Sequence, residues 1–158
     1  MLPQVTRLYG VRFTNDPDGR AAMGGSSGAA AALSMAWFHP EWYGKVLSYS
    51  GTFVNQASPI DPATPHGAWD YAASLIPQAP RKSIRVWMEV GERDLHWQDP
   101  EGTYHNWPLA NDRMAAALEA KGCDYRYLVA ANAVHVDDDV IAQTLPGALE
   151  WLWRDYPR

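Results

Sequence analysis

The chain has 158 residues, of which 47% are hydrophobic and 20% charged, and its formal net charge is -5. This composition is typical of one globular domain with a substantial core, and an acidic chain without a basic run is not expected to bind nucleic acid. No apolar stretch approaches the roughly 20 residues of a membrane-spanning helix, so no membrane partner is expected either.

The N-terminus lacks a charged region followed by an apolar run and a cleavage site. A cytoplasmic location is therefore the default expectation, whereas a secreted or periplasmic location would require an N-terminal part that precedes residue 1. The single cysteine, Cys123, excludes an intrachain disulfide. Its place beside an expected strand predicts a buried, unreactive thiol.

Short strands and helices alternate along the chain. Helical spacing of apolar residues predicts a first helix over 2–9, and a turn-forming segment at 15–19 separates it from the first strand. Strands are expected at 20–23, 45–50, 84–90 and 123–129, and further helices at 27–38, at 67–76, up to residue 121, and after residues 137–139. This alternation predicts an α/β fold, a parallel sheet flanked by helices in a single domain over 1–158.

The first strand and the helix after it enclose the pentapeptide Gly24-Gly25-Ser26-Ser27-Gly28, which fits the G-x-S-x-G pattern of a nucleophile elbow. Gly24 and Gly28 are expected where a side chain would clash in the tight turn. The turn would expose Ser26 Oγ at the carboxyl edge of the sheet and direct the Ser27 N–H towards an oxyanion. Taken alone, the pentapeptide is equally consistent with a turn that has no catalytic role.

Two segments are candidates for shaping a substrate pocket beside the serine. Residues 52–65 are rich in Pro, Ser, Thr and Asn and predict a long loop. Trp97 and Trp107, together with Gly25, are candidates to line a pocket for an apolar or aromatic substrate. For each tryptophan, packing in the core or at its rim is the alternative.

Three residues that carry chemistry follow three of the expected strands. Ser26 follows the first, Asp94 the third and His135 the fourth. Functional groups of a parallel α/β sheet gather outside the carboxyl ends of the strands, and the order Ser, Asp, His is that of α/β-hydrolase triads. The sequence therefore predicts that Ser26, Asp94 and His135 meet at one edge of the sheet.

The roles of the three residues follow from proton chemistry. A serine hydroxyl needs a base to accept its proton as it attacks a carbonyl carbon, so His135 is the candidate base. Asp94 would orient the imidazole and stabilise its charged form. Glu92 is the competing acid, and the other histidines are alternative bases, namely His39, His66, His96 and His105.

The acidic run Asp137, Asp138 and Asp139 has two interpretations. Three adjacent carboxylates suggest a metal site. Carboxylates at the start of a helix are also favoured because they cap the free N–H groups and interact well with the helix dipole. We expect capping here, and no metal or cofactor.

The chain resembles the C-terminal half of α/β-hydrolase esterases of the enterochelin-esterase and feruloyl-esterase type. The stretches that carry the resemblance are RAAMGGSSGAAAALSMAW, VLSYSGTF, VGERD, HNWPLANDRMAAAL and LPGALEWLWRDYP. The resemblance implies a serine esterase that acts on small-molecule carboxylic esters through an acyl-enzyme intermediate without a metal, with Ser26, Asp94 and His135 as its triad.

The chain departs from these esterases in its number of strands. A full α/β-hydrolase sheet has about eight, whereas four are expected here, and the loop that normally donates a second oxyanion N–H belongs to the earlier strands. The first strand would then have an open edge. The chain is therefore either a fragment or a protein that completes its sheet by homo-oligomerisation. A non-catalytic binding module, an acyltransferase and a peptidase are the alternative functions.

Overall fold

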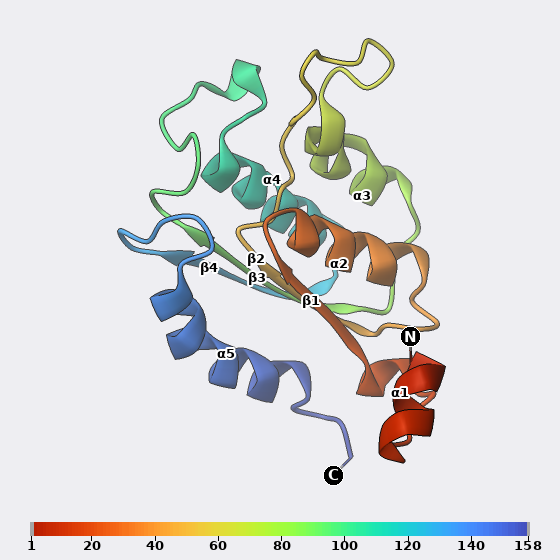
Figure 1. Ribbon diagram of the computed structural model, residues 1–158. Coiled ribbons are helices and arrows are strands. Elements are labelled where there is room, and N and C mark those ends of the chain that lie inside the picture. Colours follow the sequence, from red (N-terminus) through yellow and green to blue (C-terminus); the bar gives the residue numbers. More distant parts are fainter. Residues whose placement is uncertain (1, 158) are drawn as a thin grey trace.

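The computed structural model describes residues 2–157, and its centre is one sheet of four parallel strands (Figure 1). The strands lie in the order of the chain, so that each pairs with the next. They are β1 (Ala21–Gly25), β2 (Lys45–Tyr49), β3 (Arg85–Gly91) and β4 (Asp124–Ala130). The predicted α/β class and parallel sheet are confirmed, and all four carboxyl ends lie at the same edge.

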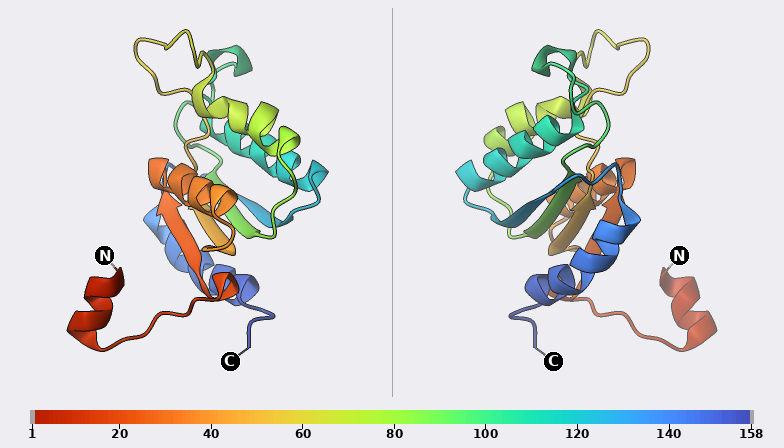
Figure 2. Two further views of the ribbon diagram at one scale, coloured as in Figure 1. Left: turned by 90° about the vertical axis from the view of Figure 1, so that its right-hand side faces the viewer. Right: turned by 90° about the vertical axis from the view of Figure 1, so that its left-hand side faces the viewer.

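Helices cover both faces of the sheet. Figure 1 shows α2, α3 and α4 on one face and α5 on the other, while α1 stands apart from the sheet on an extended segment (Figure 2). Their bounds are α1 (Leu2–Tyr9), α2 (Ser27–Phe38), α3 (Ile76–Gln78), α4 (Trp107–Ala120) and α5 (Asp138–Leu152). The helix expected over 67–76 is instead a 3-10 turn (Gly67–Trp69) and a π-helical turn (Tyr71–Leu75) that lead into α3.

The core has two layers because successive side chains of a strand point to opposite faces of the sheet. In β2, Val46 belongs to the larger cluster under α2, α3 and α4, whereas Leu47 and Tyr49 pack with residues of α5. On α2, Ala29, Ala32 and Ala36 are the buried small residues. Such short side chains allow a helix to lie close to the sheet, so α2 and the turn before it are held firmly against β1 and β2.

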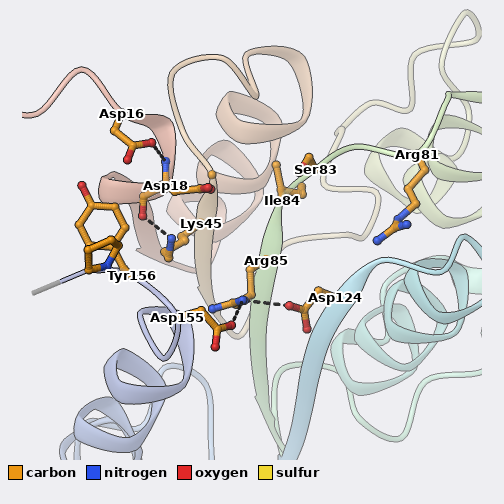
Figure 3. Close-up of a pocket in the computed structure, with 12 residues that line it drawn as sticks. Asp16, Asp18, Lys45, Arg81, Ser83, Ile84, Arg85, Asp124, Asp155 and Tyr156 are labelled. Carbon is orange, nitrogen blue, oxygen red and sulfur yellow. Dashed lines mark hydrogen bonds and ion pairs between the residues drawn. The ribbon is translucent and has the colours of Figure 1, made fainter.

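A row of charged residues lies at the amino edge of the sheet, opposite the expected site (Figure 3). Lys45, Arg85 and Asp124 are the first residues of their strands and stand in register. Arg85 donates to Asp124 Oδ2 at 2.8 Å and to Asp155 Oδ2 at 2.9 Å, and Lys45 Nζ donates to the Asp18 carbonyl. These contacts hold the segments before β1 and after α5 against the sheet around a cavity of about 310 Å³.

The free side of β1 is apolar. Met23 of β1 is 51% exposed, and Met35 of α2 and Phe13 of the preceding segment are also exposed. Together with neighbouring residues they line a groove of about 730 Å³ beside β1. The open strand edge expected from the sequence is therefore present.

Candidate active site

Ser26 lies on the tight turn that joins β1 to α2. Its backbone angles, φ 56° and ψ -126°, are rare for a residue with a side chain. The Ser26 N–H donates to the Tyr49 carbonyl of β2 at 2.9 Å, so the turn is tied to the neighbouring strand. A strand before the serine and a helix after it were both predicted, and both are present.

Gly24 and Gly28, the first and last residues of the pentapeptide, differ in their surroundings. A Cβ on Gly24 would collide with the backbone of Gly28 and would lie 2.8 Å from the Ala29 nitrogen, so the turn requires glycine there. A Cβ on Gly28 would meet nothing within 4 Å, because this position borders the groove beside β1. The expectation that Gly28 avoids a clash of its own is therefore wrong, and Gly24 alone makes the close contact.

Asp94 and His135 are in direct contact. His135 Nδ1 lies 2.5 Å from Asp94 Oδ1, and the two residues are 41 positions apart in the chain. The Asp94 side chain is 0% exposed and that of His135 is 22% exposed. An ionised carboxylate can only accept a hydrogen bond, so the imidazole tautomer that fits this contact carries its proton on Nδ1 and has Nε2 as the acceptor.

The competing acid and the other histidines have partners elsewhere. Glu92 Oε2 accepts a hydrogen bond from the Asn132 N–H at 2.8 Å, which braces the loop after β4 but does not contact an imidazole. The remaining histidines lie as follows: His39 pairs with Glu41, His66 with Asp70, and His96 with Asp99, while the His105 ring lies beside that of His96. The structure thus brings Asp94, rather than Glu92, to His135.

The loop after β4 reaches back across the sheet towards Ser26. The Val136 N–H donates to Ser50 Oγ, just beyond β2, at 2.9 Å. The Val136 side chain covers Gly25, where a Cβ would lie 2.8 Å from Val136 Cγ1. The residue after His135 therefore touches the residue before Ser26, and the three predicted residues lie at the same edge.

Thr52 is a neighbour of Ser26 that the sequence did not indicate. Its Oγ1 lies 3.2 Å from Ser26 Oγ, and its N–H donates to the Ser26 carbonyl at 3.2 Å. The buried Asn111 of α4 holds the adjacent residue through a hydrogen bond from Nδ2 to the Gly51 carbonyl at 3.0 Å. The only signal in the sequence is that Thr52 lies three residues beyond the end of β2, where the local pattern predicts no more than the start of a loop.

The two candidate pocket tryptophans have different environments. Trp107 is 3% exposed, and its ring meets that of His135 edge to face with centroids 5.7 Å apart. Trp97 is 45% exposed. Trp107 thus packs against the imidazole from within the core, whereas Trp97 lies at the surface where a bound molecule could reach it.

The acidic run before α5 acts as a helix cap. The Asp137 side chain accepts hydrogen bonds from the N–H groups of Asp139 and Val140, which confirms the capping interpretation. Among residues 2–157, no group of three or more His, Cys, Asp or Glu side chains is arranged to hold a metal ion.

Two further sequence expectations concern burial and membrane association. Cys123 is buried, and burial raises the pKa of its thiol, as expected for an unreactive cysteine. Within the described part of the chain, no helix combines the length and the apolar character that crossing a bilayer requires.

Comparisons with known proteins agree on the fold. A family model named Esterase, with the description "Putative esterase", matches residues 6–152, whereas no match was found among curated proteins. The enterobactin esterase of Shigella flexneri, solved with 2,3-di-hydroxy-N-benzoyl-glycine, superposes with a TM-score of 0.72 at 21% identity over 98% of this chain and 36% of its own. A ferulic acid esterase superposes with a TM-score of 0.64 at 17% identity, over 96% of this chain and 58% of its own.

The S-formylglutathione hydrolase of Staphylococcus aureus gives a TM-score of 0.64 at 15% identity, over 96% of this chain and 57% of its own. At such identities the superpositions establish the fold, which is a partial α/β-hydrolase fold. The chain spans about a third of the length of the enterobactin esterases that it matches, with 36% covered in the example above.

Proposed function

The chain belongs to the esterase family described by that model, and we propose that it is a serine hydrolase that cleaves carboxylic esters through an acyl-enzyme intermediate. In this proposal Ser26 is the nucleophile, His135 the general base and Asp94 the residue that orients His135. The Ser27 N–H, at the first residue of α2, belongs to the helix N-terminus and has no acceptor within the helix. We assign it to the oxyanion.

In the acylation step, Ser26 Oγ attacks the ester carbonyl carbon while its proton passes to His135 Nε2. The new Oγ–C bond forms as the carbonyl electron pair moves to oxygen, and the Ser27 N–H stabilises that oxyanion. The intermediate collapses when the bond to the alcohol oxygen breaks, and His135 returns the proton to the leaving alcohol. Asp94 stabilises the imidazolium while it carries the proton.

In the deacylation step, water takes the place of the alcohol. His135 Nε2 accepts a proton from the water as its oxygen attacks the acyl carbon, and the Oγ–C bond then breaks with return of the proton to Ser26 Oγ. The products are a carboxylic acid and a regenerated serine. None of these steps uses a metal or a cofactor.

The contact between Asp94 Oδ1 and His135 Nδ1 is the observation that carries this proposal. It orients the imidazole with Nε2 free, on a loop whose next residue packs against the residue before Ser26. In the structure the Ser26 hydroxyl is hydrogen-bonded to Thr52. Catalytic hydrogen bonds are often long or poorly aligned without substrate, so we expect the bond from Ser26 to His135 to form as the ester binds.

The oxyanion site limits the rate that we expect. Ser27 supplies one N–H, and loss of one oxyanion donor typically lowers kcat by about 100- to 1000-fold. We therefore expect slow turnover by the 158-residue chain alone. A sheet completed by further strands, from the same polypeptide or from a second copy, would restore the rate if it supplied a second donor.

The test compares wild type, Ser26→Ala and His135→Ala with p-nitrophenyl acetate, together with labelling by a fluorophosphonate. We expect a burst of p-nitrophenol and labelling of Ser26 in wild type, and neither in Ser26→Ala. Equal background rates in all three proteins, without labelling, would overturn the hydrolase proposal in favour of a non-catalytic binding module. A competing alcohol in the assay would reveal an acyltransferase through the transfer product, and a peptide substrate would reveal a peptidase.

The substrate class that we propose is a small-molecule ester with an aromatic acyl group. The similar structures include a ferulic acid esterase and an enterobactin esterase solved with a benzoyl compound, and the exposed Trp97 offers an aromatic surface near the Asp94 segment. Methyl ferulate and methyl acetate, which share a leaving group and differ only in the acyl group, test this class when they are assayed side by side. A higher kcat/KM for the acetate would count against it.

We further propose that residues 2–157 form a single partial domain that can self-associate through the free side of β1. Its apolar groove and open strand edge support this proposal, because exposed edges pair readily with other strands. Size-exclusion chromatography with light scattering should give the mass of a dimer or larger assembly. A stable monomer across the concentration range would contradict self-association and leave the hydrolase proposal unaffected.

A further inference from the structure

Val136, the residue after His135, has a backbone conformation that valine rarely adopts. Its φ is 49°, in the left-handed region, where a β-branched side chain is strained. Residues held in such regions cost of the order of 1–3 kcal/mol each and persist only where the surrounding structure enforces them. Contacts from outside the loop must therefore hold Val136 in this conformation.

Two contacts from other strands hold Val136. Its N–H donates to Ser50 Oγ at 2.9 Å, across 86 positions of sequence, and its side chain lies so close to Gly25 that a Cβ there would be 2.8 Å from Val136 Cγ1. Both partners belong to segments at the carboxyl ends of strands, after β2 and at the end of β1. The loop from β4 is thus fastened at the far side of the sheet.

Ser50 is itself held firmly. It is 3% exposed and has a φ of 51°, and its N–H donates to the Glu89 carbonyl of β3 at 2.7 Å. The Ser50 hydroxyl is therefore a fixed acceptor rather than a mobile surface group.

The contacts of Val136 with Ser50 and Gly25 are important for the position of His135 because the sheet is wide. β1 and β4 lie on opposite sides of the sheet, separated by three strand spacings, or roughly 14 Å. His135 lies in the loop after β4, whereas Ser26 lies after β1. Asp94 can set the rotation of the imidazole through Nδ1. Because Asp94 lies after β3, however, its contact does not bring the His135 loop as far as β1.

We propose that two contacts of Val136 position His135 for proton transfer with Ser26. They are the hydrogen bond from the Val136 N–H to Ser50 Oγ and the packing of the Val136 side chain against Gly25, and together we call them the latch. The proposal rests on the hydrolase function proposed above. Ser50 and Val136 are positioning residues, because they act through the place of His135 rather than on the substrate. The latch explains why strain is kept beside His135 when glycine would relieve it.

Two variants test the latch from its two sides. Ser50→Ala removes the acceptor, and Val136→Gly relieves the backbone strain but removes the contact with Gly25. Ser83→Ala is the matched control, since Ser83 is exposed near the amino edge of the sheet. We expect both latch variants to lower kcat by about 10- to 100-fold, the loss typical of a misplaced catalytic group, with little change in KM, while the control matches wild type.

A second readout does not depend on activity. The Nδ1 proton of His135, hydrogen-bonded to Asp94, should give a downfield proton NMR signal in wild type and in Ser83→Ala, and the latch variants should broaden or lose it. A folded Ser50→Ala or Val136→Gly protein with unchanged signal and kcat would overturn the latch. If wild type has no esterase activity the hydrolase proposal fails, and the NMR comparison still decides whether the latch places His135. If one variant does not fold, the other provides the test.

Discussion

Asp94 Oδ1 lies 2.5 Å from His135 Nδ1, and the Asp94 side chain is fully shielded from solvent. Replacement by asparagine keeps the shape but turns an obligate acceptor into a group that can donate, which favours the wrong tautomer of the imidazole. We expect Asp94→Asn to lower kcat for ester hydrolysis by about 10⁴-fold, measured by steady-state kinetics with p-nitrophenyl acetate.

Glu92→Gln is the control for this prediction. Glu92 accepts from the Asn132 N–H and does not contact His135, and the glutamine oxygen can accept the same hydrogen bond. Its kcat should stay close to that of wild type. A large loss in Glu92→Gln with a small one in Asp94→Asn would reverse the assignment of the acid.

Thr52 is expected to order the nucleophile. Its hydroxyl shares a hydrogen bond of 3.2 Å with Ser26 Oγ and is mostly shielded from water. With Thr52 Oγ1 as the donor to Ser26 Oγ, the serine proton remains available to His135, and the bond persists in the transition state. A net contribution of about 1 kcal/mol, usual for such a bond, then predicts that Thr52→Val lowers kcat about fivefold while Thr52→Ser retains it. Pre-steady-state acylation rates would check this, and faster acylation in Thr52→Val would instead show that Thr52 restrains Ser26 in a resting position.

Glu89 gives the protein a pH-dependent stability. It is a buried carboxyl on β3 that accepts from Thr144 Oγ1 at 2.7 Å, and burial raises its pKa above the usual 4.5. Because the folded state binds this proton more tightly than the unfolded state, the stabilisation is complete below the unfolded pKa and is lost as pH rises through the folded pKa.

The neutral variant Glu89→Gln should therefore gain stability relative to wild type as pH rises from the ordinary glutamate value of 4.5 through the raised pKa of Glu89. Urea unfolding at several pH values measures the difference in free energy of unfolding. Glu150→Gln, which removes an exposed carboxyl of α5, should show a nearly constant difference. A constant difference for Glu89→Gln as well would contradict the prediction.

Arg85 should contribute to stability but not to catalysis. It bonds to Asp124, to Asp155 and to the carbonyls of Trp151 and Leu152 at the end of α5. Its side chain is 18% exposed. Arg85→Ala leaves the Leu152 carbonyl without its donor, whereas Arg154 still donates to Asp124 Oδ2 and to the Trp151 carbonyl, so we expect a loss of about 1–2 kcal/mol in the free energy of unfolding. The exposed Arg12→Ala should change it by less than about 0.5 kcal/mol, and KM should be unchanged in both.

Much of the fold followed from hydrophobic patterns in the sequence. Each of the four strands lies within one or two residues of its predicted bounds, because apolar, β-branched runs between turn residues are a local signal. The approach of Asp94 to His135 also followed, since carboxyl ends of parallel strands share an edge. Their catalytic roles, and that of Ser26, stay predictions.

The residues that support the site were not predictable in the same way. Thr52 and Ser50 act through contacts with segments far away in sequence, and no local pattern records such contacts. Val136 contradicts its own backbone preference, so sequence rules point away from the conformation it has. At Gly28 the sequence motif predicts a steric clash that the structure does not show, because of these two positions only Gly24 has no room for a Cβ.

The sequential strand order also bears on how the chain assembles. Each parallel pairing requires an entire crossover to close first, and such non-local contacts form slowly. Synthesis proceeds from the N-terminus, so the serine turn can be shaped long before the ribosome has delivered β4 and the histidine loop. Ser26 and His135 would then come together only at the final stage of folding. In a partly folded chain Ser26 would have no base to accept its proton and would be unreactive.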